Sequence, residues 1–114
     1  LQVLLDAGAN LEARNEDGLT PLIFAAGWNR NPEVIQVLID AGADLEARDK
    51  DGWTPLMLAA AFNENPEVIQ LLLDAGADPT ASDPLGKTAW DYAQENEDLK
   101  GTGAYWRLND LRFE

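Results

Sequence analysis

Short apolar runs alternate with polar stretches that contain glycine, and this alternation repeats along the chain. Aligned without gaps, residues 1–34 and 35–68 are identical at 23 of 34 positions. The alignment columns that keep one residue type in all three copies include Gly8, Gly42 and Gly76; Gly18, Gly52 and Gly86; and Thr20, Thr54 and Thr88. Self-similarity at a fixed spacing is typical of repeat proteins, in which each unit packs only against its neighbours.

Each copy predicts a loop, a helix, a short turn and a second helix. Thr20-Pro21 supplies an N-cap and a proline at the first helical position, so we expect a helix to about Trp28. Asn31-Pro32-Glu33 predicts the start of a second helix, which is too apolar for a surface helix and ends at Gly42. The next copy repeats these signals at Thr54-Pro55 and at Asn65-Pro66-Glu67.

The two ends of the chain depart from the regular copy. Residues 1–8 predict only the end of a helix, so the complete units are expected at 9–42 and 43–76. Residues 77–114 predict a capping unit whose closing helix spans 102–113, with Ala104, Tyr105, Leu108 and Leu111 facing inward. Its water-facing side is expected to carry Arg107, Asn109, Asp110 and Arg112. Since residue 1 is Leu rather than Met, we expect a longer parent protein.

The composition narrows the possible chemistry. The chain has 21 acidic and 8 basic residues, a net charge of −13, and no Cys or His. This charge disfavours nucleic acid and anionic membranes as partners and favours a protein with a basic surface, although it also serves solubility alone. Disulfides, Cys/His zinc sites and imidazole bases are excluded. The lack of Cys fits a reducing compartment, so we expect a cytoplasmic location.

Two motif blocks resemble the ankyrin-repeat family across essentially the whole chain. The family signature Thr-Pro-Leu-His-x-Ala is matched at residues 20–25 and 54–59, and the helix ending Leu-Leu-x-x-Gly-Ala-Asp at 72–78. The resemblance implies an all-α ankyrin-repeat solenoid of stacked helix–loop–helix units with hairpin-like loops. It also implies a protein-binding role, with the usual contact surface on the concave face formed by the hairpin tips and first helices.

Three features differ from the family pattern. The period is 34 residues rather than about 33, with the extra residue in the turns at 29–31 and 63–65; the Asn-Pro-Glu-Val there resembles a variant common in prokaryotic ankyrin proteins. The family histidine, which ties loop to loop, is replaced by Ile23, Met57 and Asp91, so packing must supply part of that rigidity. The first unit lacks its opening helix, so we expect at least one more repeat in the parent and exposed apolar surface at this end.

Positions that vary between otherwise identical units suggest where a partner binds. Units one and two differ in the loop at 15, 16 and 19, and near the end of the first helix at 27, 28 and 30. By analogy with the family, these positions line the concave groove. Trp and Tyr are common anchors at protein interfaces. The candidate partner-binding residues are Glu16, Leu19, Trp28, Lys50, Trp53, Phe62 and Lys87.

Each candidate also has a structural interpretation. The aromatic residues could pack between repeats, and Trp90 and Trp106 are expected in the core or cap. Acidic residues recur at the loop tips, where they could form a rim that attracts a basic partner or could serve turn chemistry. These residues are Glu16, Asp17, Asp49, Asp51 and Asp83.

Three functional hypotheses follow from these patterns. A protein-interaction module or scaffold would bind its partner through the concave face and would expose a stripe containing Leu19 and Trp53. The alternative is a structural spacer, or an element that self-associates through its open N-terminal end. An enzyme is disfavoured, because the carboxylates lie in solvated loops where nothing raises a pKa. The sequence therefore predicts no catalytic, cofactor-binding or metal-binding residue.

Overall fold

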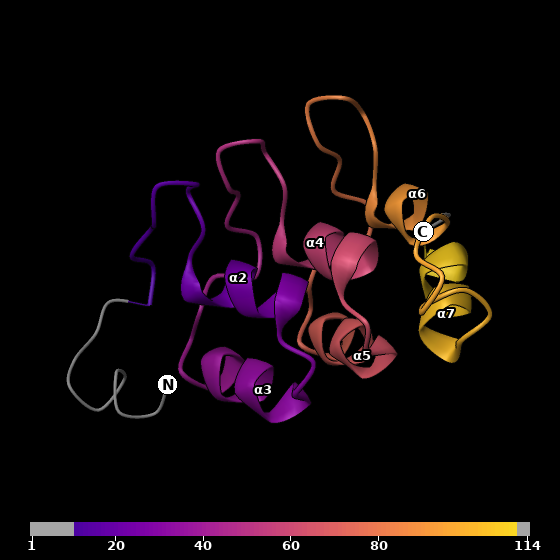
Figure 1. Cartoon of the computed structure of the whole chain (residues 1–114), viewed down its shortest axis with the longest axis horizontal. Helices are drawn as coiled ribbons and strands as arrows, with labels where there is room; N and C mark the ends of the chain where they lie inside the picture. Colours follow the sequence, from indigo (N-terminus) through magenta and orange to yellow (C-terminus); the bar gives the residue numbers. More distant parts are fainter. Residues whose placement is uncertain (1–10, 112–114) are drawn as a thin grey trace.

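The computed structural model describes residues 11–111, which fold into three consecutive pairs of helices (Figure 1). The pairs are α2 (Pro21–Trp28) with α3 (Pro32–Asp40), α4 (Pro55–Phe62) with α5 (Pro66–Asp74), and α6 (Ala89–Ala93) with α7 (Gly103–Leu111). The first helices pack in one row, α2 on α4 and α4 on α6, and the second helices in another, α3 on α5 and α5 on α7. The expected stack of helix–loop–helix units is therefore confirmed.

Local capping explains where the helices begin. The hydroxyl oxygens of Thr20 and Thr54 accept hydrogen bonds from the N–H groups of Ile23 and Met57, both at 3.3 Å. The side-chain oxygens of Asn31 and Asn65 accept from the N–H groups two residues later, both at 3.0 Å. A proline follows each cap at the first helical position, which needs no N–H donor. The four predicted helix starts are confirmed.

The core lies between the two helix rows and continues through all three pairs. Its largest fully buried apolar side chains include Leu22, Ile35, Leu38, Leu56, Ile69, Leu72 and Leu108. No pair could bury its apolar surface alone, so stacking supplies most of the stability. Ile23 and Met57, which occupy the histidine column of the family motif, are also buried, and Ile23 packs with Ala47 and Leu58. Apolar packing therefore takes the place of a polar side chain at these two positions, whereas Asp91, in the same column, accepts a hydrogen bond from the N–H of Thr88 at 2.9 Å.

The C-terminal cap differs from its prediction in the exposure of Trp106 and in the contacts of Arg107. Ala104 and Leu108 are buried as expected, and Tyr105 and Leu111 are half-buried against the core. Trp106 belongs to the cap as predicted, but its side chain is 54% exposed. Trp106 lies two residues from both Ala104 and Leu108, which places it on the opposite face of α7. Trp90 is half-buried and packs on Tyr105, with 4.8 Å between ring centroids.

Arg107 was expected to face water, yet it joins two helices. Its guanidinium donates hydrogen bonds to Gln70 at 2.7 Å and to Asp74 at 2.8 Å, so α7 is attached to α5. The predicted helix end at residues 1–7, with Gly8 after it, and the predictions for Arg112 and residue 113 lie outside the described residues.

Candidate functional site

Three loops project from the same side of the stack, one before each first helix (Figure 1). The side-chain oxygen at the first turn position accepts hydrogen bonds from the N–H groups two and four residues later, at 2.9–3.0 Å. These first turn residues are Asn15, Asp49 and Asp83. Turn chemistry therefore explains two of the five acidic tip residues. Asp83 is only 5% exposed, so of its two interpretations the turn residue agrees with the structure and the acidic rim does not.

Neighbouring loops are held side by side by arginines. The guanidinium of Arg14 donates to the carbonyl of Gly18 in its own loop and to that of Arg48 in the next. Arg48 repeats this arrangement, donating to Gly52 at 2.7 Å and to Ser82 at 2.8 Å. The loops therefore stand at a fixed spacing from one another, as a preformed binding surface requires.

Buried asparagines fix the turns that join first and second helices. The amide of Asn63 donates to the carbonyls of Ala26 at 2.8 Å and Asn29 at 2.9 Å in the preceding repeat. Asn96 does the same to Ala60 and Asn63, both at 3.0 Å. Asn63 lies in the turn that the sequence predicted to hold the extra residue, so this turn bonds one repeat to the next.

A groove runs between the loop tips and the first helices α2 and α4. We call it the hairpin groove; it encloses about 260 Å³ and is lined by Asp17, Leu19, Trp28, Asp49, Lys50, Asp51, Trp53, Leu58 and Phe62. Five of the seven predicted partner-binding residues line this one surface. The other two, Glu16 and Lys87, are exposed on the first and third loops.

A row of aromatic rings forms the apolar part of the hairpin groove. Trp28 and Phe62 stack with 5.8 Å between centroids and 13° between planes, and Phe62 and Trp53 stack at 5.8 Å and 12°. Tyr92 extends the row from Trp53, at 4.2 Å. Trp28 and Phe62 are 49% and 50% exposed. Large half-exposed rings that lie together on a surface are typical of interaction sites.

Leu19 and Trp53 are less exposed than predicted. Both are half-buried, and both pack against the buried cluster of Ile23, Ala47 and Leu58. The exposed part of the expected stripe therefore lies at Trp28 and Phe62. These residues end the first helices α2 and α4, and their side chains extend past the core. Trp53 forms the bridge between that exposed part and the core.

Charged groups border the aromatic row on the loop side. Lys50 and Asp17, on neighbouring tips, form an ion pair at 3.2 Å, and both side chains are more than half exposed. The Lys87 ammonium lies over the ring of Tyr92, 5.6 Å from its centroid. At the other end, Arg30 and Glu64 pair at 2.8 Å beside Trp28 and Phe62. Exposed pairs of this kind contribute about 0–1 kcal/mol each.

Beneath the third loop, the hydroxyl of Tyr92 donates a hydrogen bond to the carboxylate of Asp83. Burial and this hydrogen bond raise the pKa of Tyr92 above its ordinary value of 10.0. Burial alone would raise the pKa of Asp83, but the hydrogen bonds from Tyr92, Lys87 and Leu85 hold it below 3.8. The pair is thus a protonated phenol bound to a carboxylate, and it fixes the third loop on α6.

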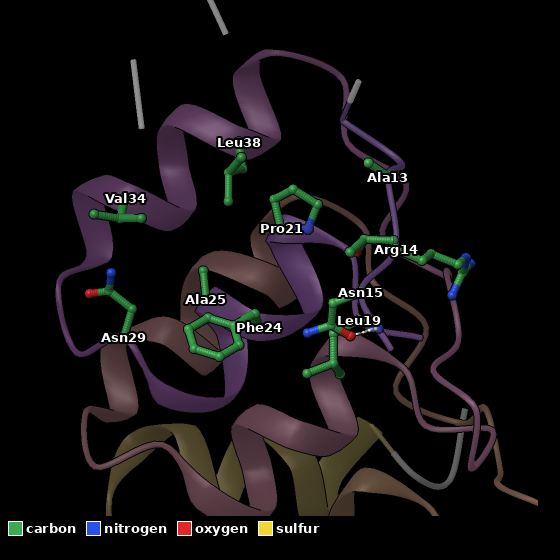
Figure 2. A pocket seen from close by; sticks show the side chains of 11 residues that line it. Ala13, Arg14, Asn15, Leu19, Pro21, Phe24, Ala25, Asn29, Val34 and Leu38 are labelled. Carbon is green, nitrogen blue, oxygen red and sulfur yellow. Dashed lines mark hydrogen bonds between the residues drawn. The ribbon is translucent and has the colours of Figure 1, made fainter. Parts of the chain in front are cut away.

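Sequence reasoning missed Phe24, which is half exposed and lies 5.5 Å from Trp28. Units one and two differ at this position, with Phe24 in the first and Leu58 in the second. That difference could have identified Phe24 as a candidate partner-binding residue. Figure 2 shows Phe24 with Pro21, Val34 and Leu38 around a second pocket, of about 660 Å³, at the α2–α3 end of the described stack. We call this the end pocket.

Residues 11–111 contain neither a metal-binding cluster nor a helix that could cross a membrane. No cluster of three or more Asp or Glu side chains in that range could hold a metal ion. Within the same range, none of the helices combines the length and the apolar character needed to cross a membrane. Every buried side-chain nitrogen and oxygen of the described residues has a hydrogen-bond partner.

Comparison with known proteins bears on the repeat architecture. A family model described as ankyrin repeats, in three copies, matches residues 1–83. Comparison with curated proteins gave no match. Ankyrin repeats are generally protein–protein interaction modules, and domains built from them are typically non-catalytic. The family match covers most of the chain and agrees with the stacked all-α helix pairs, so the chain belongs to the ankyrin-repeat family.

Proposed function

We propose that this chain binds a protein partner in the hairpin groove and acts as an interaction module or scaffold. The observation that carries the proposal is the exposed pair of stacked rings, Trp28 and Phe62, inside a groove whose other wall is formed by the loop tips. Aromatic side chains supply large contact areas at little conformational cost and dominate many interfaces. The bonded loops keep this surface in place before a partner arrives.

The role of each candidate residue follows from its position. Trp28 and Phe62 serve as anchors, and Trp53 supports them from below. Glu16, Lys50 and Lys87 are exposed polar groups on the three loops, where they can set the partner's orientation. Leu19 extends the apolar wall. The net charge of −13 favours a partner with a basic surface.

Affinity capture from a lysate of the source organism tests the groove. Trp28→Ala and Phe62→Ala should each reduce recovery of the same bound protein at least about tenfold, as expected of anchors. Trp106→Ala is the matched control, because Trp106 is equally exposed but lies on α7 outside the groove. Circular dichroism should show all three variants folded. Unchanged recovery with both groove variants, or an equal loss with Trp106→Ala, would refute the proposal.

A second candidate function is association with another copy of this chain through the end pocket. The half-exposed ring of Phe24 and the apolar lining of that pocket support it. Sedimentation velocity over a range of concentrations should then show a reversible dimer that Phe24→Ser disrupts and Trp106→Ser leaves intact. A monomer at every concentration would exclude this second function and leave the first untouched.

A further inference from the structure

Negative charges outnumber positive charges in the lining of the hairpin groove, and not all of them are paired within the protein. Three carboxylates, those of Asp17, Asp49 and Asp51, face one ammonium, that of Lys50. Asp49 is engaged by the N–H groups of its own turn, and Asp17 is paired with Lys50. Asp51 is exposed, and its carboxylate forms no ion pair or hydrogen bond with another residue in the described part of the chain. One negative charge beside the rings is thus available.

The far end of the aromatic row is also acidic. Asp83, Asp91 and Glu95 lie close enough to Tyr92 for their charges to act on its hydroxyl. The protein places a cation on this part of the row, since the Lys87 ammonium lies 5.6 Å from the Tyr92 centroid. Cations bind the faces of Trp, Tyr and Phe, and a nearby carboxylate attracts the same cation by its charge. The contact of Lys87 with Tyr92 therefore shows, within the protein itself, that a cation can bind to this row of rings.

Among residues 11–111, no cation lies over the face of a ring in repeats one and two, and Arg30, which lies beside Trp28 and Phe62, is paired with Glu64. Trp28, Phe62 and Trp53 stack in nearly parallel planes beside Asp51, while Lys50 is paired with Asp17. A planar guanidinium stacks on aromatic rings and is weakly hydrated, so arginine suits this place better than lysine. Adjacent ring centroids are 4.2–5.8 Å apart, so an extended segment, at about 3.3 Å per residue, covers the row with only a few residues.

We propose that the hairpin groove binds an extended segment of its protein partner in which an arginine adjoins a large apolar residue. The apolar side chain packs on Trp28 and Phe62, and the guanidinium stacks beside Trp53 and pairs with Asp51. This inference rests on the proposed function and adds the chemistry of the partner. It predicts that recognition depends on the sign of the charge at Asp51 and not on the net charge of the protein.

Synthetic peptides provide the probe. Short capped Gly/Ser peptides with a central Leu-Arg, Leu-Ser, Leu-Glu or Ser-Arg pair are titrated into the whole chain. Nuclear magnetic resonance follows the indole N–H signals, assigned by replacing each Trp with Phe. The Leu-Arg peptide should shift the signals of Trp28 and Trp53, leave that of Trp106 unchanged, and bind about tenfold more tightly than Leu-Ser or Ser-Arg. Leu-Glu should bind most weakly.

Two charge-reversal variants distinguish an effect of pairing with Asp51 from an effect of the protein's net charge. Asp51→Lys should reverse the preference, so that Leu-Glu binds more tightly than Leu-Arg. Asp110→Lys makes the same change in net charge on the exposed side of α7 and should keep the original preference.

Three results would overturn the inference. These are equal binding of Leu-Ser and Leu-Arg, an equal effect of the two reversals, and no shift of Trp28 or Trp53 with any peptide. None of them refutes the proposed function, which is judged separately by protein capture with the Trp28 and Phe62 variants.

Discussion

At the scale of single residues, the buried pair of Asp83 and Tyr92 joins a loop to the helix beneath it. A hydrogen bond to a charged group contributes about 1.5–3 kcal/mol. Tyr92→Phe should therefore lower the free energy of unfolding by about 1.5–3 kcal/mol at neutral pH, measured by urea denaturation. Tyr105→Phe is the control, because its hydroxyl makes no hydrogen bond within the described residues. Equal stability of the two variants would contradict the assignment.

The same pair predicts how stability depends on pH. The pKa of Asp83 is lowered in the folded protein, so its stabilising effect is present above the ordinary value of 3.8 and is lost as the pH falls through the folded value. The stability difference between the wild type and Tyr92→Phe should be constant above about pH 5 and should shrink below about pH 4. Urea titrations along this range measure it. A difference that grew on acidification would show that the carboxylate is not the acceptor.

Asp83 also shows what a single sequence could not reveal. Its role as a turn residue is local and was one of two interpretations. Its burial depends on Tyr92, nine residues away on the next helix, and neither Phe24 nor Leu58 in the same column carries a hydroxyl. Trp53 is a similar case: its exposure was overestimated because the neighbouring apolar cluster is assembled from two repeats.

At the scale of the structural elements, the turn between α4 and α5 bonds one repeat to another. Asn63→Ala removes both amide donors to the preceding repeat and should cost about 2–4 kcal/mol. Asn29→Ala is a matched control. Asn29 accepts the same local N–H bond, at 2.9 Å, but its amide makes no bond to another repeat within residues 11–111. Its loss should stay near 1 kcal/mol in denaturant unfolding. If both variants lost the same free energy of unfolding, the effect would come from the local turn and not from the bonds between repeats.

Gly52 lies close to the neighbouring loop. Its φ is +84°, and an added Cβ would lie 2.6 Å from Cδ of Pro84 in the next loop. Gly42 has a similar φ of +95° but open space around it. Gly42→Ala should cost about 1–2 kcal/mol, from backbone strain alone, and Gly52→Ala clearly more. Thermal unfolding of the two variants compares them, and equal midpoints would argue against contact between the loops.

The helices themselves were predictable because their signals are local. Thr-Pro and Asn-Pro caps determine four starts within a few residues of sequence. Which side of α7 faces the core was harder to predict from the sequence. Trp106 is apolar, yet it faces solvent because Ala104 and Leu108 pack inward, and Arg107 finds its partners on α5. Those contacts join α7 to another repeat, so the sequence of α7 alone does not predict them.

At the scale of the whole molecule, like charges outweigh ion pairs. The net charge is −13, and each exposed ion pair, such as Lys50–Asp17, contributes at most about 1 kcal/mol. Raising sodium chloride from about 0.01 M to about 0.15 M shortens the Debye length from about 30 Å to about 8 Å and should raise the melting temperature. Scanning calorimetry tests this, with choline chloride to exclude specific sodium binding. A falling melting temperature would show that the ion pairs dominate.

The bonds between loops and turns also bear on how such a molecule can change in length over evolution. Arg14 bonds to residue 48, Arg48 to residue 82 and Asn63 to residue 29, so each tie joins positions 34 residues apart. A duplicated copy of residues 43–76, placed after Gly76, would meet matching donors and acceptors on both sides. A gene that duplicates this segment in frame thereby lengthens its binding surface by one unit without inventing a new interface.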